Sequence, residues 1–158
     1  MIRRELNFLK ESPFSPAFRG QRGSDFEFDL KDEDALNEVR DVAGAYVIVA
    51  GDRTHFIYPQ GKSSVIYIGE STQLRTRLKQ HLRNLRDLEQ CETDDLHRYN
   101  EANTRYQYFK SFGAYVYLFY CLKSTQDSKD LESWILWKFY EKHRALPVGN
   151  GARSFSRP

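Results

Sequence analysis

Three side chains near the middle of the chain, Tyr67, Arg77 and His81, are of types that bind an anion or transfer a proton. Arg77 and His81 are four residues apart in a run that repeats leucine at helical intervals, so they are predicted to share one helix face. Tyr67 lies in an apolar, β-branched run that ends at Gly69, which is typical of a buried strand. We therefore expect the domain to be arranged around this strand-to-helix corner, with the three side chains directed to one place.

A fourth candidate is Glu132, which lies within the run Leu131-Glu132-Ser133-Trp134-Ile135-Leu136-Trp137. This run predicts a largely buried helix that begins at Asp127 or Ser128 and continues to about Lys142. A buried carboxylate is costly unless it is paired or binds a cation. On a solvated edge, the same residue would be an ordinary acid in the first turns of a helix, favoured by the helix dipole. The residues alone leave both interpretations open.

The elements that position these residues are predicted to be strands followed by helices. Strands are indicated at 44–50 and 64–68, with a possible short strand at 55–58 between them. They would form an antiparallel hairpin or a three-stranded meander leading into the helix of Arg77. The most strand-like run of the chain is 113–122, and it precedes the helix of Glu132. This order predicts an α/β (α+β) domain.

The first 43 residues are predicted to be an N-terminal extension that packs on, or leads into, a domain spanning 44–158. Eight acidic residues lie between positions 25 and 41, and they could form a partner surface or imitate DNA. The more ordinary interpretation is the solvated face of a strand and a short helix. Residues 1–43 carry seven basic and ten acidic side chains, whereas the remainder carries 17 and 12. The basic excess therefore lies with the candidate site.

A polar segment from about 90 to 110 interleaves aromatic and basic residues. Such a pattern can stack on unpaired bases of a nucleic acid, although half of these aromatics are expected to be core or hinge contacts. The residues concerned are Arg98, Tyr99, Arg105, Tyr106, Tyr108, Phe109 and Lys110.

The composition is that of one globular domain, with 158 residues, 40% hydrophobic and 29% charged. Two cysteines, Cys91 and Cys121, do not make a disulfide framework. We expect no signal peptide and no membrane partner, because no apolar run is long enough for either. These observations predict a cytoplasmic protein.

Taken in order, the candidate residues resemble the signature of the GIY-YIG nuclease superfamily, over about residues 44–150. The matching positions are Gly44-Ala45-Tyr46, Tyr67-Ile68-Gly69, Arg77, His81, Glu132 and Asn150. Ala45 stands where the family usually has isoleucine or valine. The interval of 21 residues between the two tyrosines is longer than in the compact members and is similar to that of restriction-type members.

The resemblance implies a small, mainly antiparallel three-stranded sheet flanked by helices, which cleaves DNA phosphodiester bonds with one divalent metal ion, Mg²⁺ or Mn²⁺. Glu132 would be the metal ligand, and Arg77 would hold the phosphate through its planar fork. Either Tyr46 or Tyr67 would take the proton of the attacking water, and His81 could relay it. The choice of tyrosine stays open, with a slight preference for Tyr67 because it is expected nearer to Arg77 and His81.

Further residues are expected to contact DNA. Gly69 would let a phosphate approach, and a basic stripe on the first long helix would follow the DNA backbone. Asn150 would orient its loop or the surroundings of Glu132. The predicted DNA-contacting set is Gly69, Arg75, Lys79, Arg83, Arg86 and Asn150. Double- and single-stranded DNA are both possible substrates, and the alternative function is a non-catalytic nucleic-acid-binding module with the same fold.

Overall fold

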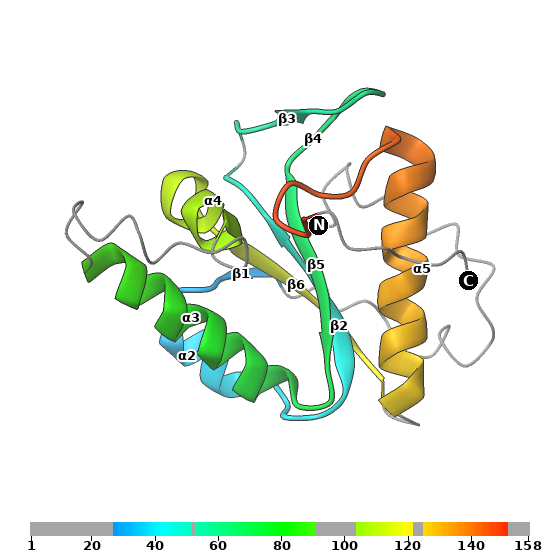
Figure 1. The fold of residues 1–158 in the computed structure, drawn as a ribbon. Helices are drawn as coiled ribbons and strands as arrows, with labels where there is room; N and C mark the ends of the chain where they lie inside the picture. Colours follow the sequence, from blue (N-terminus) through cyan, green and yellow to red (C-terminus); the bar gives the residue numbers. More distant parts are fainter. Residues whose placement is uncertain (1–26, 52, 91–103, 122–124, 152–158) are drawn as a thin grey trace.

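The computed structural model describes residues 27–51, 53–90, 104–121 and 125–151. In these ranges the chain forms a four-stranded antiparallel sheet with the strand order β1-β6-β2-β5 (Figure 1). Its strands are β1 (Glu27–Asp29), β6 (Tyr115–Tyr120), β2 (Gly44–Val49) and β5 (Val65–Ser71). A separate two-stranded ribbon, β3 (Phe56–Ile57) and β4 (Lys62–Ser63), lies between β2 and β5 in sequence.

Four helices in the described ranges cover both faces of this sheet. Figure 1 shows α5 on one face and the other three helices on the opposite face. Successive residues of β2 therefore pack into two separate cores, because side chains of a strand alternate between its faces. Tyr46 and Ile48 pack with the leucines of α3, whereas Ala45 and Val47 pack with α5. The helices are α2 (Glu33–Glu38), α3 (Leu74–Gln90), α4 (Thr104–Phe112) and α5 (Thr125–His143).

The main sheet has four strands where three were expected, and the difference is β1. This strand comes from the predicted N-terminal extension and pairs with β6, with Phe28 opposite Val116. It is only three residues long and two of them are acidic, so its sequence carries little strand signal. The predicted strands 44–50, 64–68 and 113–122 are confirmed as β2, β5 and β6. The short strand expected at 55–58 forms as β3, but it pairs with β4 and not with the main sheet.

The polar segment from 90 to 110 contains a helix, α4, that the sequence did not predict. Tyr106 and Phe109 are buried in the core, and Tyr108 packs on the rings of Phe56 and Phe112. The positions from 91 to 103 of that segment lie outside the described residues. In the described part, these aromatics serve packing, which is the second of the two expectations.

The acidic segment helps to build the corner between β5 and α3. Asp41 accepts hydrogen bonds from the backbone N–H of Thr76 (2.9 Å) and from its hydroxyl (2.8 Å), in the first turn of α3. These bonds lower the pKa of Asp41, and the nearby Arg75 adds to the effect. A carboxylate at the first turn satisfies donors that have no partner within the helix. Among the described helices, none has the length and apolar character that crossing a membrane requires.

Candidate active site

The centre of the candidate site is a buried hydrogen bond between Tyr46 and His81. Tyr46 lies on β2 opposite Gly69 of β5, and its hydroxyl oxygen is 2.6 Å from Nε2 of His81 on α3. Both side chains are 0% exposed. A Cβ atom at Gly69 would lie 2.6 Å from that hydroxyl oxygen, so glycine is needed to leave room for the phenol. Gly69, which was expected to admit a phosphate, here admits Tyr46.

The other ring nitrogen of His81 forms a second buried hydrogen bond. Nδ1 of His81 is 2.8 Å from the hydroxyl oxygen of Tyr106 on α4, and Nδ2 of Asn84 donates to the same oxygen at 2.9 Å. Tyr46, His81, Tyr106 and Asn84 thus form one chain of hydrogen bonds, which we call the tyrosine–histidine chain. The imidazole has a partner on both nitrogens, which fixes the plane of the ring.

Sequence reasoning did not single out Tyr106 or Asn84 as members of the site. A signal for Asn84 was present, because it lies three residues after His81 and seven after Arg77, on the same helix face. Tyr106 carried no comparable signal, since its helix begins 14 residues after the end of α3. Only the tertiary contact between α3 and α4 brings Tyr106 to His81.

Burial keeps the Tyr46–His81 pair electrically neutral. Burial raises the pKa of Tyr46 well above its ordinary value, and Arg77 and Arg105 oppose this rise. Burial also lowers the pKa of His81 to about 3, and the same two arginines add to that shift. At neutral pH the pair is therefore a phenol and an uncharged imidazole. One hydrogen lies between them, carried by oxygen or by nitrogen according to the tautomer of His81.

Tyr67 approaches the same pair through its ring. The ring centroid of Tyr67 lies 6.0 Å from that of Tyr46 and 5.7 Å from that of His81. Its exposed fraction is 6%, so it is buried like Tyr46. Nε2 of His81 forms its hydrogen bond with Tyr46, although the sequence slightly favoured Tyr67 as its neighbour.

Arg77 is the half-buried member of the group, and its charge acts on both Tyr46 and His81. Its Nη1 donates to Oε1 of Gln80 at 3.0 Å, which holds the side chain along α3. A cation beside a neutral buried pair can bind an anion that arrives from solvent. The structure therefore brings together Tyr46, Tyr67, Arg77 and His81, four of the five predicted catalytic residues.

Glu132, the fifth, lies on α5, which covers the other face of the sheet. One turn earlier on α5, the hydroxyl of Ser128 donates to the Glu70 carboxylate near the end of β5 at 2.9 Å. Figure 1 shows that α5 runs opposite in direction to β5. Glu132 follows Ser128 by one helical turn on α5, the helix that packs against β5.

The partial exposure of Glu132 bears on its two interpretations. Its neighbours Leu131, Trp134 and Ile135 are among the apolar residues of α5 that enter the core. A carboxylate at the boundary with solvent has no large burial cost that a metal ion must offset. It nevertheless offers the hard oxygen ligands that Mg²⁺ prefers, and Mg²⁺ usually retains water and substrate oxygens as its other ligands. In the described part of the chain, no group of three or more His, Cys, Asp or Glu could hold a metal ion.

Asn150 uses its whole amide on the backbone of β5. Its Nδ2 donates to the carbonyl oxygen of Ile68 at 2.7 Å, and its Oδ1 accepts from the N–H of Ile68 at 2.9 Å. Because β5 is an edge strand, these bonds pair a backbone segment that has no neighbouring strand on that side. This position agrees with the expectation that Asn150 orients its loop, and both ends of the amide are occupied.

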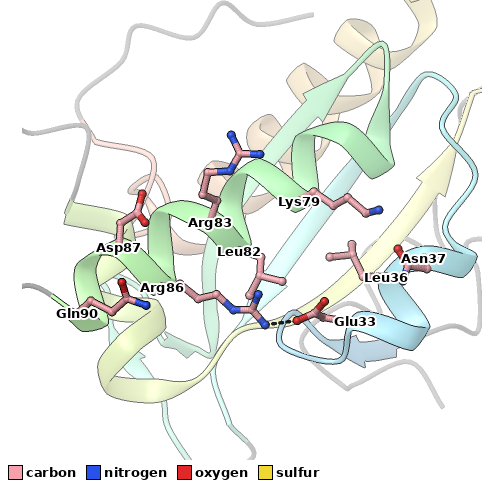
Figure 2. Close-up of a pocket in the computed structure, with 9 residues that line it drawn as sticks. All are labelled: Glu33, Leu36, Asn37, Lys79, Leu82, Arg83, Arg86, Asp87 and Gln90. Atoms are coloured by element: carbon pink, nitrogen blue, oxygen red, sulfur yellow. Dashed lines mark hydrogen bonds and ion pairs between the residues drawn. The ribbon is translucent and has the colours of Figure 1, made fainter.

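The predicted basic stripe, Arg75, Lys79, Arg83 and Arg86, lies on the opposite side of α3 from Arg77. At about 100° per residue, the mean directions of the stripe and of the face with Arg77, His81 and Asn84 differ by roughly 170°. Three residues of the stripe, Lys79, Arg83 and Arg86, line a groove between α2 and α3 (Figure 2) with a volume of about 350 Å³. Arg86 forms an ion pair with Glu33 across this groove, and Nη1 of Arg75 donates to the carbonyl oxygen of Asn37 at 3.4 Å. Two of the four stripe residues are thus held by α2.

Comparisons with protein-family models, with curated proteins and with solved structures found no match for this chain.

Proposed function

We propose that the protein is a metal-dependent DNA endonuclease of the GIY-YIG type, which hydrolyses phosphodiester bonds in the cytoplasm. The observation that supports this most is the buried hydrogen bond between Tyr46 and His81 beside the half-buried Arg77. These residue types are the ones needed to hold a phosphate and to move a proton away from an attacking water. The pairing of β2 with β5, in which Tyr46 lies opposite Gly69, positions Tyr46 for this hydrogen bond.

In this proposal, Arg77 meets the substrate first, because it is partly exposed whereas Tyr46 is fully buried. Its guanidinium turns towards a phosphate of the DNA and uncovers the Tyr46 hydroxyl. The phenol then accepts a proton from the attacking water while it passes its own proton to Nε2 of His81. This exchange avoids a free phenolate but forms a buried imidazolium, so the negative charge of the bound phosphate must offset the burial and the arginine charges that lower the pKa of His81. Tyr106 accepts the hydrogen bond from Nδ1–H of His81 and so keeps Nε2 ready to receive the proton.

The residues present fit a divalent cation, Mg²⁺ or Mn²⁺, at Glu132. When bound, such an ion would neutralise charge on the phosphate and lower the pKa of a bound water. Glu132 would hold it, and Ser128 and Glu70 would form its protein surroundings at the end of β5. The DNA would lie across the edge of β5, between the site face of α3 and the first turns of α5.

The test is a cleavage assay on plasmid, single-stranded and branched DNA, with Mg²⁺, with Mn²⁺ and with a chelator. We expect the wild-type protein to cut at least one substrate only when a metal ion is present. Glu132→Ala should lose this activity but keep its affinity for DNA. Asp130→Ala is the matched control, because Asp130 is an exposed acid on the same helix. Equal behaviour of wild type and Glu132→Ala on every substrate would exclude the proposed site.

The second candidate function is a non-catalytic nucleic-acid-binding module. The complete burial of Tyr46 favours it, because a phenol that solvent cannot reach does not act on water without a change in the site. This alternative predicts DNA binding that does not depend on Glu132, and no cleavage with either metal ion. The same assay therefore separates the two functions.

A further inference from the structure

Arg105 on α4 is a buried cation that the proposed reaction does not use. Only 8% of the residue is exposed, and its Nε has no hydrogen-bond partner in the described part of the chain. A buried N–H donor that lacks an acceptor has a free-energy cost. An anion that binds to Arg105 would provide the missing partner.

The position of Arg105 is set by close packing at β5. A Cβ atom built at Gly149 would lie 3.1 Å from Cβ of Arg105 and 2.8 Å from the carbonyl oxygen of Ile66. Cβ of Arg105 therefore packs close to Gly149, in the loop that carries Asn150, beside Ile66 of β5. Glycine at position 149 leaves the space for this approach.

The guanidinium of Arg105 lies over the ring of Tyr67, with its central carbon 4.2 Å from the ring centroid. Stacking on a ring uses the flat face of a guanidinium and leaves its in-plane N–H groups available for an oxyanion. Arg77 on α3 and Arg105 on α4 both lower the pKa values of Tyr46 and His81, so both guanidiniums are near the same neutral pair. Two cations near one neutral pair repel each other, and an anion between them would remove this repulsion.

We propose that Arg105 is a second phosphate ligand, so that Arg77 from α3 and Arg105 from α4 together hold one phosphate group beside Tyr67. The inference rests on the proposed function for the source of that phosphate, which is the DNA backbone. The chemistry it requires is a tetrahedral oxyanion with at least two oxygens free, one for each guanidinium. Inorganic phosphate shares this chemistry and is a suitable probe.

The main alternative is that Arg105 only supports the ring of Tyr67. The two roles differ in what Arg105→Met does to stability. If the contact with Tyr67 is the purpose of Arg105, this substitution lowers the melting temperature. If Arg105 is a phosphate ligand, Arg105→Met removes an unpaired buried charge, and the melting temperature without phosphate stays equal or rises.

The experiment measures the melting temperature of the full chain at increasing inorganic phosphate, with chloride at equal ionic strength as the reference. A ligand that binds only the folded state raises the melting temperature as its concentration exceeds Kd. We expect this rise for the wild type and for Lys110→Met, in which an exposed cation of the same helix is removed. Arg105→Met and Arg77→Met should lose the rise, and Arg105→Lys should bind phosphate about tenfold more weakly, because lysine lacks the planar fork.

A wild type without a phosphate response, or an Arg105→Met protein with an unchanged response, would overturn the inference. If Arg105→Met does not fold, an unchanged phosphate affinity of Arg105→Lys overturns it equally. Cleavage of DNA is measured on the same proteins to keep the two proposals apart. A phosphate response that depends on Arg105 without any cleavage supports the ligand and rejects the nuclease. Cleavage that is unchanged in Arg105→Met, with an unchanged phosphate response, rejects the ligand alone.

Discussion

The two sides of α3 carry polar residues in similar number but in different surroundings. The inner side presents Arg77, His81 and Asn84 to β2 and α4, where His81 is completely buried and bonded on both ring nitrogens. The outer side presents the basic stripe to α2 and solvent, where the Arg86–Glu33 pair is about half exposed on each partner. Electrostatic interactions are strong and directional in a buried setting and weak in an exposed one. The comparison teaches that the inner side suits chemistry, whereas the outer side can contribute only to affinity.

The largest effect on the cleavage rate is expected when His81, on the inner side of α3, is substituted. His81→Ala removes the proton acceptor of Tyr46, and the loss of a positioned acid–base group reduces the cleavage rate by about 10³-fold. It also leaves the hydroxyl of Tyr46 without its partner, at a cost of about 1–3 kcal/mol, whereas Tyr106 keeps the hydrogen bond from Asn84. Single-turnover cleavage and urea unfolding measure the two effects. Arg83→Ala, on the outer side of the same helix, is the control that should change neither by a comparable amount.

The neutral state of His81 predicts acid sensitivity. The pKa of His81 is about 3 in the folded protein, below its ordinary value of 6.5, so the unfolded chain takes up this proton first. Its contribution to stability is complete above pH 6.5 and is lost as the pH falls from 6.5 towards 3. The free energy of unfolding should then decrease by up to about 1.4 kcal/mol per pH unit.

Measured against pH, the difference in unfolding free energy between wild type and His81→Gln should therefore shrink below pH 6.5. His143, whose pKa burial also lowers, adds a similar slope to both proteins and cancels in the difference. His55→Gln, at an exposed histidine, is the matched control and should follow the wild type. A difference that stays constant from pH 7 to pH 4 would show that His81 is not held neutral.

A smaller effect is expected at Tyr106, a positioning residue that acts through His81. Tyr106→Phe leaves Nδ1 of His81 and Nδ2 of Asn84 without their shared partner, so the imidazole loses a fixed orientation. We expect the cleavage rate at saturating DNA to fall about tenfold, which corresponds to about 1.4 kcal/mol in the barrier. The KM should not change, and the pH profile of the rate should shift. Tyr108→Phe on the same helix controls for the loss of a tyrosine hydroxyl as such, and an equal loss in both variants would remove the special role of Tyr106.

The smallest effect is expected on the outer side. Lys79→Gln combined with Arg83→Gln should weaken DNA binding by less than about fivefold, because an exposed ion pair contributes about 1 kcal/mol or less. The dependence of binding on salt should become shallower, and the cleavage rate at saturating DNA should stay unchanged. Titrations at several salt concentrations measure this. A reduced rate at saturating DNA would place the outer side within the catalytic surface.

Glu33→Gln also tests whether the outer side contacts DNA, because it releases Arg86 from its ion pair. If the outer side contacts DNA, this variant should bind DNA slightly more tightly than the wild type at low salt and equally at high salt. Asp34→Gln is a suitable control, since Asp34 is an exposed acid on the same short helix. An unchanged affinity in both variants would limit DNA contacts to the inner side.

The parts of the fold that sequence could predict are those with strong local periodicity. The apolar runs that became β2, β5 and β6 and the leucine repeat of α3 carry their own signals, and so does the spacing that puts Arg77 and His81 on one face. The strand and short helix expected in the acidic segment form as β1 and α2, but the pairing of β1 with β6 joins residues nearly ninety positions apart in sequence. Local pattern holds no information on such a contact.

In the candidate site, too, local sequence patterns predicted some residues, whereas tertiary contacts determined the others. Arg77, His81 and the two tyrosines were predicted together because strand and helix periods direct them to one corner. Both tyrosine rings lie in the core on the α3 side of the sheet, and the packed register, with Tyr46 opposite Gly69, places the Tyr46 hydroxyl at Nε2 of His81. Tyr106 and Arg105 come from a helix with weak amphipathic character, so only tertiary packing places them at the site. The basic stripe was recognised as one face of α3, but its docking against α2 depends on the tertiary fold.

The most direct test of the account is single-turnover cleavage of DNA by wild type and Arg77→Met, each with Mg²⁺ or Mn²⁺ and at saturating DNA. Arg77 touches the substrate in this account, and the outer side of α3 remains intact in the variant. We predict metal-dependent cleavage by the wild type and a loss of at least about 10²-fold in Arg77→Met, because a preorganised donor to the transition state is removed. Cleavage by Arg77→Met at the wild-type rate, or no cleavage of any DNA by the wild type, would contradict the central claim.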